Sequence, residues 1–81
     1  MKFLEADIKK ILSKTLKVKI SKITDNFSMN SYPKWDSLNH LKLVIALEGK
    51  IGISFKEKDV TQIISYKLIK LHLKKMGVKI L

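Results

Sequence analysis

Apolar residues recur every three or four positions near the start of the chain. The recurring set is Leu4, Ile8, Ile11, Leu12 and Leu16. Lysines occupy many of the positions between them, so a helix here would have one apolar side and one charged side. The pattern predicts an amphipathic helix over roughly residues 2–17.

Residues 18–36 lack this periodicity. Scattered apolar side chains alternate with Ser, Asn and Asp, and the single proline of the chain, Pro33, lies here. We expect a loop rather than a strand at residues 18–20, and a connection of this length in a small domain is typical of a functional segment. The loop ends at Asp36 and Ser37, two residue types that are favoured at a helix N-cap.

An almost continuously apolar segment follows at residues 38–51, and it predicts the most buried helix of the fold. Gly52 is suited to end this helix. The weakly apolar positions of the segment stack along one side of the cylinder, so we expect them to form its exposed face. These positions are Asn39, Lys42, Ala46, Gly49 and Lys50.

Two further helices complete the pattern. Ser54 and Glu57 fit a capping box, which predicts a short helix over roughly residues 56–63. Ser65 is expected to cap a last helix that ends at Gly77. The sequence therefore predicts an all-α fold, a small four-helix bundle with a long loop between helices one and two and a short third helix.

The composition narrows the class of protein. A chain of 81 residues holds one domain at most, and 46% hydrophobic residues is typical of a globular protein. Without cysteine there is no disulfide, no thiolate metal site and no protein thiol to act as a nucleophile. The first twenty residues are too charged for a signal peptide, and no segment reaches membrane-spanning length. We expect one cytoplasmic domain over residues 1–81, monomeric and without membrane insertion.

The net charge of +10 comes from seventeen basic residues, all of them lysine, against seven acidic ones. Such a balance is typical of proteins that meet nucleic acid, an anionic membrane surface or an acidic partner. Lysine lacks the planar guanidinium group with which arginine makes the commonest specific contacts to guanine. The sequence also has no helix-turn-helix signature. A small basic helical module that binds nucleic acid is the alternative function, although no specific nucleic acid is expected as a partner. The reason for the excess of lysine stays open.

Trp35-Asp36-Ser37-Leu38 places a serine where the long loop meets the buried helix. A cap position lies outside the helical hydrogen-bond ladder, so the hydroxyl of Ser37 should face solvent. The positive end of the helix also favours a phosphate ester on this oxygen. From these residues alone, a plain N-cap serine remains the simpler interpretation. We interpret Trp35 as an aromatic anchor for the loop.

Neither histidine completes a catalytic or metal site. Asp36, Ser37 and His40 lie within one helical turn and cannot adopt the geometry of a catalytic triad, so we predict no catalytic residue and no enzyme activity. We expect His40, if protonated, to lie near a phosphate on Ser37. His72 is expected to be a packed surface histidine, and two histidines without clustered carboxylates make no metal site.

Three segments resemble the acyl carrier protein family: Asp36-Ser37-Leu38, the run from Leu41 to Glu48, and the run from Ile51 to Phe55. The order of the expected helices is also similar, over nearly the whole chain. The resemblance implies that a separate phosphopantetheinyl transferase attaches 4'-phosphopantetheine from coenzyme A to Ser37. The chain would then carry acyl or aminoacyl groups as thioesters on this arm. The implied partners include an acyl- or aminoacyl-loading ligase and a downstream acyltransferase or synthase.

The same resemblance implies roles for neighbouring residues. Asp36 would present the serine to the transferase and its metal ion, and Leu38 would anchor the first helical turn in the contact surface. The residues expected to dock partners are Asp36, Leu38, Asn39, Lys42, Ile45 and Lys50. The core positions expected to part around an acyl chain are Val44, Leu47, Phe55, Val60 and Ile63.

The second predicted helix departs from the family in its charge. Carriers of fatty acid synthesis usually have carboxylates where this chain has Asn39, Lys42, Gly49 and Lys50, and only Glu48 remains. Basic partner enzymes would be repelled by this surface. We therefore expect a partner with an acidic or apolar face, in a specialised lipid, polyketide or surface-polymer pathway rather than routine fatty acid biosynthesis. The cargo stays open.

Overall fold

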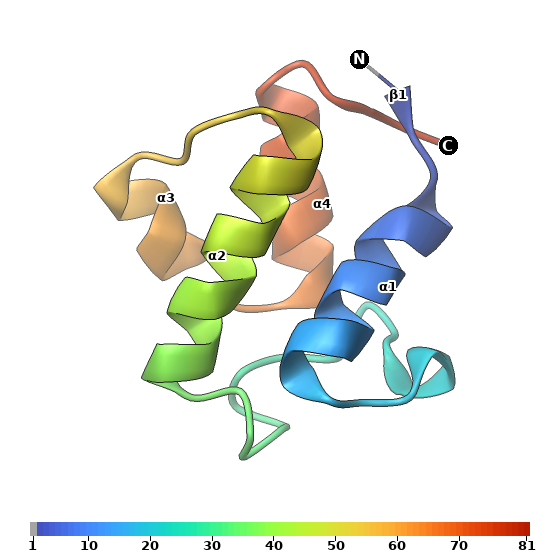
Figure 1. The fold of residues 1–81 in the computed structure, drawn as a ribbon, viewed down its shortest axis with the longest axis vertical. Coiled ribbons are helices and arrows are strands. Elements are labelled where there is room, and N and C mark those ends of the chain that lie inside the picture. Colours follow the sequence, from blue (N-terminus) through green and yellow to red (C-terminus); the bar gives the residue numbers. More distant parts are fainter. Residues whose placement is uncertain (1) are drawn as a thin grey trace.

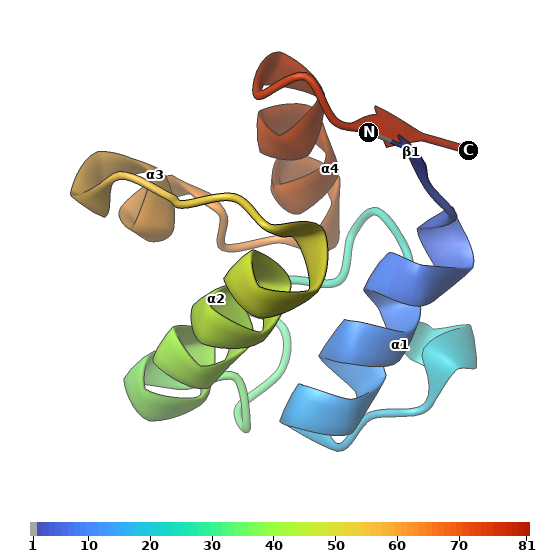
Figure 2. The same ribbon diagram turned by 45° about the horizontal axis from the view of Figure 1, so that its top comes forward.

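The computed structural model describes residues 2–81 and is mostly helical (Figure 1). Its helices are α1 (Glu5–Leu16), α2 (Ser37–Ile51), α3 (Glu57–Gln62) and α4 (Tyr66–Lys75). α1 and α2 run antiparallel side by side, α4 lies behind them, and α3 flanks α2 on the side away from α1 (Figures 1 and 2). The expectation of an all-α four-helix bundle with a long first loop and a short third helix is confirmed. Within the described residues, no helix has both the length and the apolar character needed to cross a bilayer.

The two ends of the chain pair with each other, which the sequence did not indicate. β1 (Lys2–Phe3) and β2 (Lys79–Ile80) form a two-stranded parallel sheet, visible beside the chain ends in Figure 2. The amide of Glu5 also donates to the carbonyl of Leu81 at 2.9 Å. The predicted helix start at residue 2 was therefore wrong. Pairing with a segment distant in sequence satisfies the backbone groups that a first helical turn would otherwise use.

One cluster of buried apolar side chains joins α1, α2, α4 and the long loop, and it includes the residue that follows α3. Its members are Ile8, Leu12, Leu16, Val18, Ile23, Phe27, Trp35, Leu43, Val44, Leu47, Ile51, Ile63, Tyr66, Ile69, Leu73 and Val78. Val44, Leu47 and Ile63 were expected in the core and are buried there. Phe55 and Val60, from the same expectation, are partly buried against this cluster.

Buried side chains anchor the loop between α1 and α2 to the core. A 3₁₀ turn, η1 (Ile20–Lys22), takes the place of the strand considered near residues 18–20. The rings of Phe27 and Trp35 stack at 5.5 Å between centroids, and both side chains are buried. The hydroxyl of Tyr32 donates to the carbonyl of Leu16 at 3.0 Å. These contacts hold the loop against the end of α1 and thereby fix where α2 begins.

The predicted cap of the last helix is confirmed, whereas that of the third helix was wrong. The amide of Leu68 donates to the hydroxyl of Ser65 at 3.1 Å, which caps α4 as expected. At α3 the helix starts after Lys56, whose amide donates to the carboxylate of Asp59 at 3.2 Å. Ser54 stays exposed and takes no part in the cap.

An ion-pair cluster around Lys70 ties α4 to α1 and to the loop. The ammonium of Lys70 lies 3.1 Å from a carboxylate oxygen of Glu5 and 2.8 Å from one of Asp25. The hydroxyl of Tyr66 donates to the same oxygen of Glu5 at 2.8 Å. The hydrogen bond from Lys70, helped by that from Tyr66, lowers the pKa of Glu5, and Lys70 likewise lowers the pKa of Asp25.

This cluster predicts an acid-sensitive contribution to stability. A carboxyl group whose pKa is depressed in the folded state stabilises the protein above its ordinary pKa, and this effect is lost as the pH falls through the depressed value. Lys70→Met should therefore be less stable than the wild type at neutral pH, and the difference should shrink below the ordinary pKa of Glu5, which is 4.5. Urea unfolding followed by circular dichroism at neutral and acid pH checks this. Lys75→Met, at an exposed lysine of the same helix, is the control, and an equal pH dependence in both variants would contradict the assignment.

Candidate functional site

Ser37 is the first residue of α2 and is exposed, as predicted. The N-cap is Asp36, whose carboxylate accepts a hydrogen bond from the amide of Asn39 at 2.9 Å. The interpretation of Ser37 as a plain N-cap residue was therefore wrong, because Asp36 fills that position. Within residues 2–81 the hydroxyl of Ser37 has no hydrogen-bond partner, and the residue is exposed at the surface.

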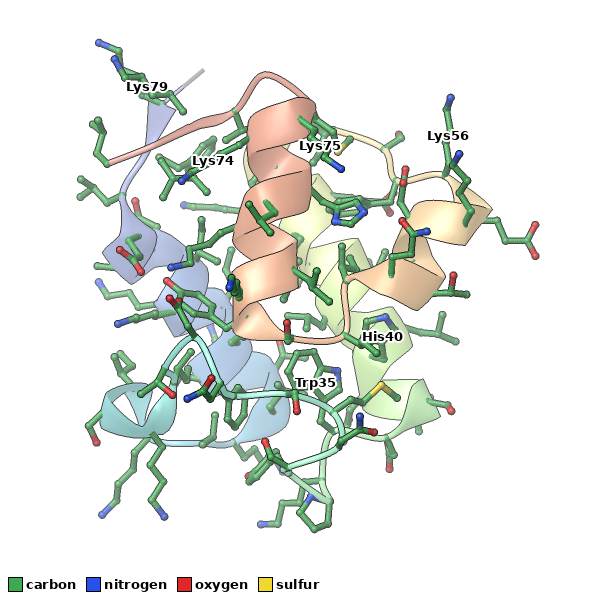
Figure 3. All side chains as sticks on the ribbon, turned by 180° about the vertical axis from the view of Figure 1, so that it is seen from behind. Trp35, His40, Lys56, Lys74, Lys75 and Lys79 are labelled. Carbon is green, nitrogen blue, oxygen red and sulfur yellow. The ribbon has the colours of Figure 1, made fainter. Side chains whose placement is uncertain are left out.

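A buried chain of two hydrogen bonds lies beneath this serine. The indole N–H of Trp35, only 1% exposed, donates to Nδ1 of His40 at 3.0 Å (Figure 3). Nε2 of His40 lies 2.6 Å from the carbonyl oxygen of Val60. A carbonyl can only accept, so Nε2 carries the proton and Nδ1 is the acceptor. The imidazole is neutral in this arrangement, and both of its nitrogens are used inside the protein.

These contacts confirm Trp35 as the anchor of the loop and overturn the expectation for His40. The imidazole is 6% exposed and is held between Trp35 and the backbone at Val60, so it is not available to a phosphate on Ser37. The one-turn spacing from Ser37 suggested proximity. The sequence could not show that α3 covers this side of α2.

An apolar hollow of about 350 Å³ lies beside Ser37, between the start of α2 and the region of α3. It is lined by Met29, Ser37, His40, Leu41, Val60, Thr61 and Ile64. A group attached to the serine can reach this hollow directly, because Ser37 forms part of its wall. The sequence did not indicate Met29, Thr61 or Ile64, since the loop and the α3 region meet α2 only through tertiary packing.

The solvent-facing side of α2 carries an apolar strip, defined here as Leu38, Leu41 and Ile45. Their exposed fractions are 63%, 54% and 68% respectively. The expectation that the weakly apolar positions alone form the exposed face was therefore wrong. α1 and α3 flank α2 on either side (Figure 1), and the three side chains of this strip are exposed to solvent. Large exposed apolar residues gathered on one helix are typical of a contact surface for another molecule.

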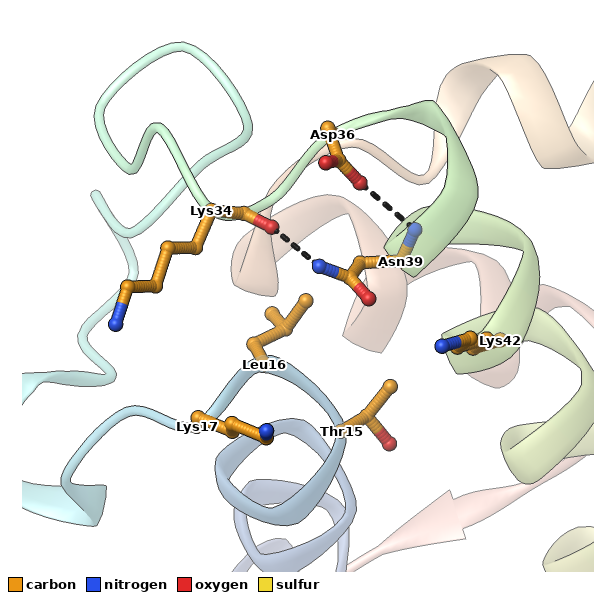
Figure 4. A pocket seen from close by; sticks show the side chains of 7 residues that line it. All are labelled: Thr15, Leu16, Lys17, Lys34, Asp36, Asn39 and Lys42. Atoms are coloured by element: carbon orange, nitrogen blue, oxygen red, sulfur yellow. Dashed lines mark hydrogen bonds between the residues drawn. The ribbon is translucent and has the colours of Figure 1, made fainter.

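The polar side of α2 faces α1. Lys42 and Lys50 are exposed, and Asn39 is half-buried. The side-chain amide of Asn39 donates to the carbonyl of Lys34 at 2.7 Å, next to the capping bond that its backbone amide donates to Asp36 (Figure 4). Asn39 therefore ties the last turn of the loop to the helix and is only partly available to a partner.

Glu48 is the one acidic residue of α2, and its role is internal. Its carboxylate accepts a hydrogen bond from the amide of Phe55 at 2.8 Å. This bond fixes the turn after Gly52, whose positive φ of 77° suits glycine. Glu48, the one carboxylate that this helix keeps from the acidic pattern of fatty acid synthesis carriers, therefore stabilises a turn.

His72 is packed, as expected. Its Nδ1 lies 3.0 Å from the carbonyl of Leu68, and its Nε2 lies 3.0 Å from the side-chain oxygen of Gln62. In the described part of the chain, no three His, Asp or Glu side chains are grouped as a metal site would require.

The fold and the site together define a small helical bundle that presents one serine at the exposed start of its second helix. No protein-family model matches the chain. The chain is similar to the acyl carrier protein of Buchnera aphidicola subsp. Schizaphis graminum (strain Sg), with 35% identity over 63 residues, which cover 78% of this chain and 80% of that protein. The chain belongs to the acyl carrier protein family. Proteins of this family are carriers and not enzymes.

The buried hydrogen-bond chain predicts coupled effects on stability. Trp35→Phe leaves Nδ1 of His40 without a donor, and His40→Leu leaves the indole N–H and the carbonyl of Val60 unpaired. Each variant should lower the free energy of unfolding by about 1–3 kcal/mol. The double variant should lose about 0.5–1.5 kcal/mol less than the sum, because both changes break the same bond. Urea unfolding of all three variants measures this, and strictly additive losses would show that the two side chains are not coupled.

Proposed function

We propose that residues 1–81 form one acyl-carrier-like domain that bears 4'-phosphopantetheine on Ser37 and holds acyl or aminoacyl groups on it as thioesters. The observation that carries the proposal is the exposed and unbonded hydroxyl of Ser37 at the start of α2, beside an apolar hollow. Membership of the acyl carrier protein family supports it.

The residues around Ser37 fit such an arm. The first backbone N–H groups of α2 and the positive end of its macrodipole favour the negative phosphodiester on Oγ. The hollow beside the serine is mostly apolar and suits a flexible chain with few charges. The arm would supply the thiol that this cysteine-free chain lacks. The phosphodiester of the arm would therefore lie at the positive end of α2, and the rest of the arm would lie in the apolar hollow.

The attachment itself needs a separate transferase, with Ser37 as its substrate residue. The Oγ–H bond of Ser37 is replaced by an Oγ–P bond, the proton passes to a base of the transferase, and adenosine 3',5'-bisphosphate leaves coenzyme A. Asp36 would help to present the serine to the transferase and its metal ion. Its carboxylate already accepts the amide of Asn39, so its position is fixed before the enzyme binds.

The partners proposed for the loaded carrier are a loading ligase for acyl or aminoacyl groups and a downstream acyltransferase or synthase. They would dock on Asp36, Leu38, Asn39, Lys42, Ile45 and Lys50. The apolar strip gives this surface its contact area, and the lysines disfavour basic partners. We place the carrier in the cytoplasm and in a specialised lipid, polyketide or surface-polymer pathway. The nucleic-acid alternative has the net charge as its support, and no comparison adds to it.

Arm attachment is the first test of this proposal. The purified protein is incubated with coenzyme A and a broad-specificity phosphopantetheinyl transferase, and its intact mass is measured. The wild type should gain the mass of one phosphopantetheine, whereas Ser37→Ala should gain nothing because it lacks the acceptor oxygen. Ser54→Ala, at another exposed serine next to a helix start, should load like the wild type. No gain with any of several transferases would reject the carrier function.

The apolar strip should matter to partners more than to folding. Ile45→Ser removes a side chain that is 68% exposed, so the free energy of unfolding should change by no more than about 0.5 kcal/mol. Loading by the transferase should lose about fivefold or more in kcat/KM if the strip is a contact surface. Leu71→Ser, at an exposed leucine of α4, is the matched control. Equal loading of both variants would remove Ile45 from the docking surface.

A further inference from the structure

Two hollows lie along the boundary between α1 and α2, and lysines surround both. The first, of about 350 Å³, lies where α1 ends and α2 begins (Figure 4). The second, of about 360 Å³, lies at the opposite end of the same helix pair. Together they are lined by six exposed lysines, which we call the basic seam: Lys10, Lys14, Lys17, Lys34, Lys42 and Lys50.

The acidic residues of the chain do not neutralise the basic seam. Among residues 2–81 the lysine ion pairs are those of Lys70, so no seam lysine has an internal carboxylate partner. The two carboxylates that line the hollows, Asp7 and Asp36, each accept from a backbone amide at a helix start. Beyond them, hydrogen bonds occupy the carboxylates of Glu5, Asp25, Glu48 and Asp59.

The position of the basic seam links it to the serine. One hollow is lined by Asp36 and Asn39, which flank Ser37 and Leu38 in the sequence. Helical spacing places Lys42 and Lys50 on the α1 side of the apolar strip, whereas Ser37 lies on the α3 side. An enzyme that acts on the serine and covers the strip therefore reaches the basic seam as well.

We propose that the basic seam is the docking site for an acidic segment of the partner enzymes, with carboxylate side chains entering the two hollows. This inference rests on the proposed function, because it assigns the chemistry of the partners of that carrier. Six lysines around concave surfaces concentrate positive potential there, and ammonium groups accept carboxylates in many orientations. Each hollow has room for one or two side chains. A nucleic-acid backbone would leave the neighbouring apolar strip uncovered, whereas a protein partner can cover both surfaces.

The test uses the unmodified protein and a blocked hexaglutamate peptide as the probe, in a binding titration at low ionic strength. The seam variant is Lys14→Glu with Lys17→Glu, and the control is Lys74→Glu with Lys75→Glu on α4 (Figure 3). Each Lys→Glu removes two units of charge, so both variants have a net charge of +6 instead of +10. The seam variant should bind the peptide roughly tenfold more weakly than the wild type, and the control should lose about twofold or less.

Equal weakening in both variants would mean that net charge alone attracts the peptide, and it would overturn the proposal, as would unchanged binding by the seam variant. A decathymidylate that binds more tightly than the peptide and is lost in the seam variant alone would assign the surface to nucleic acid. Circular dichroism verifies folding. If a Glu variant does not fold, the same pairs changed to Gln repeat the comparison. Because the titration does not involve the arm, its failure is separate from a failure to load Ser37.

Discussion

The hydrogen bonds from Trp35 to His40 and from His40 to Val60 are the constraint on which the site depends. The indole of Trp35 is fixed in the core, and the next two residues of the chain lie at the surface. Asp36 then caps α2, and Ser37 is left at the surface. The same imidazole joins α2 to the backbone of the α3 region, so it also shapes the hollow beside the serine. These two buried hydrogen bonds thus help to set both the exposure of Ser37 and the apolar wall next to it.

The acidic and basic side chains of this protein have different surroundings. Most carboxylates are bound within the protein, as in the caps at Asp36 and Asp59, the turn held by Glu48 and the cluster around Lys70. The lysines that remain exposed give the surface its basic character, including the boundary between α1 and α2. The partners proposed above would therefore need to complement a basic surface. This feature separates the chain from the acidic carriers that it otherwise resembles.

Local signals in the sequence predicted the four helices, the long loop and the cap at Ser65, because each depends on residues within one or two turns. Three features depend on distant segments and were missed. The strand pair joins residues 2–3 to residues 79–80, His40 is covered by the α3 region, and the apolar strip is exposed because neither flanking helix reaches it. Periodicity identifies apolar positions, but it does not show which of them a neighbouring element will cover.

The most direct test is the state of Ser37 in the cell. The protein should be purified from the organism that makes it, without added transferase, and its intact mass and peptide map should be measured. The account predicts one phosphopantetheine, located on the peptide that contains Ser37. A chain that is wholly unmodified in growing cells, or an arm located on another residue, would contradict it.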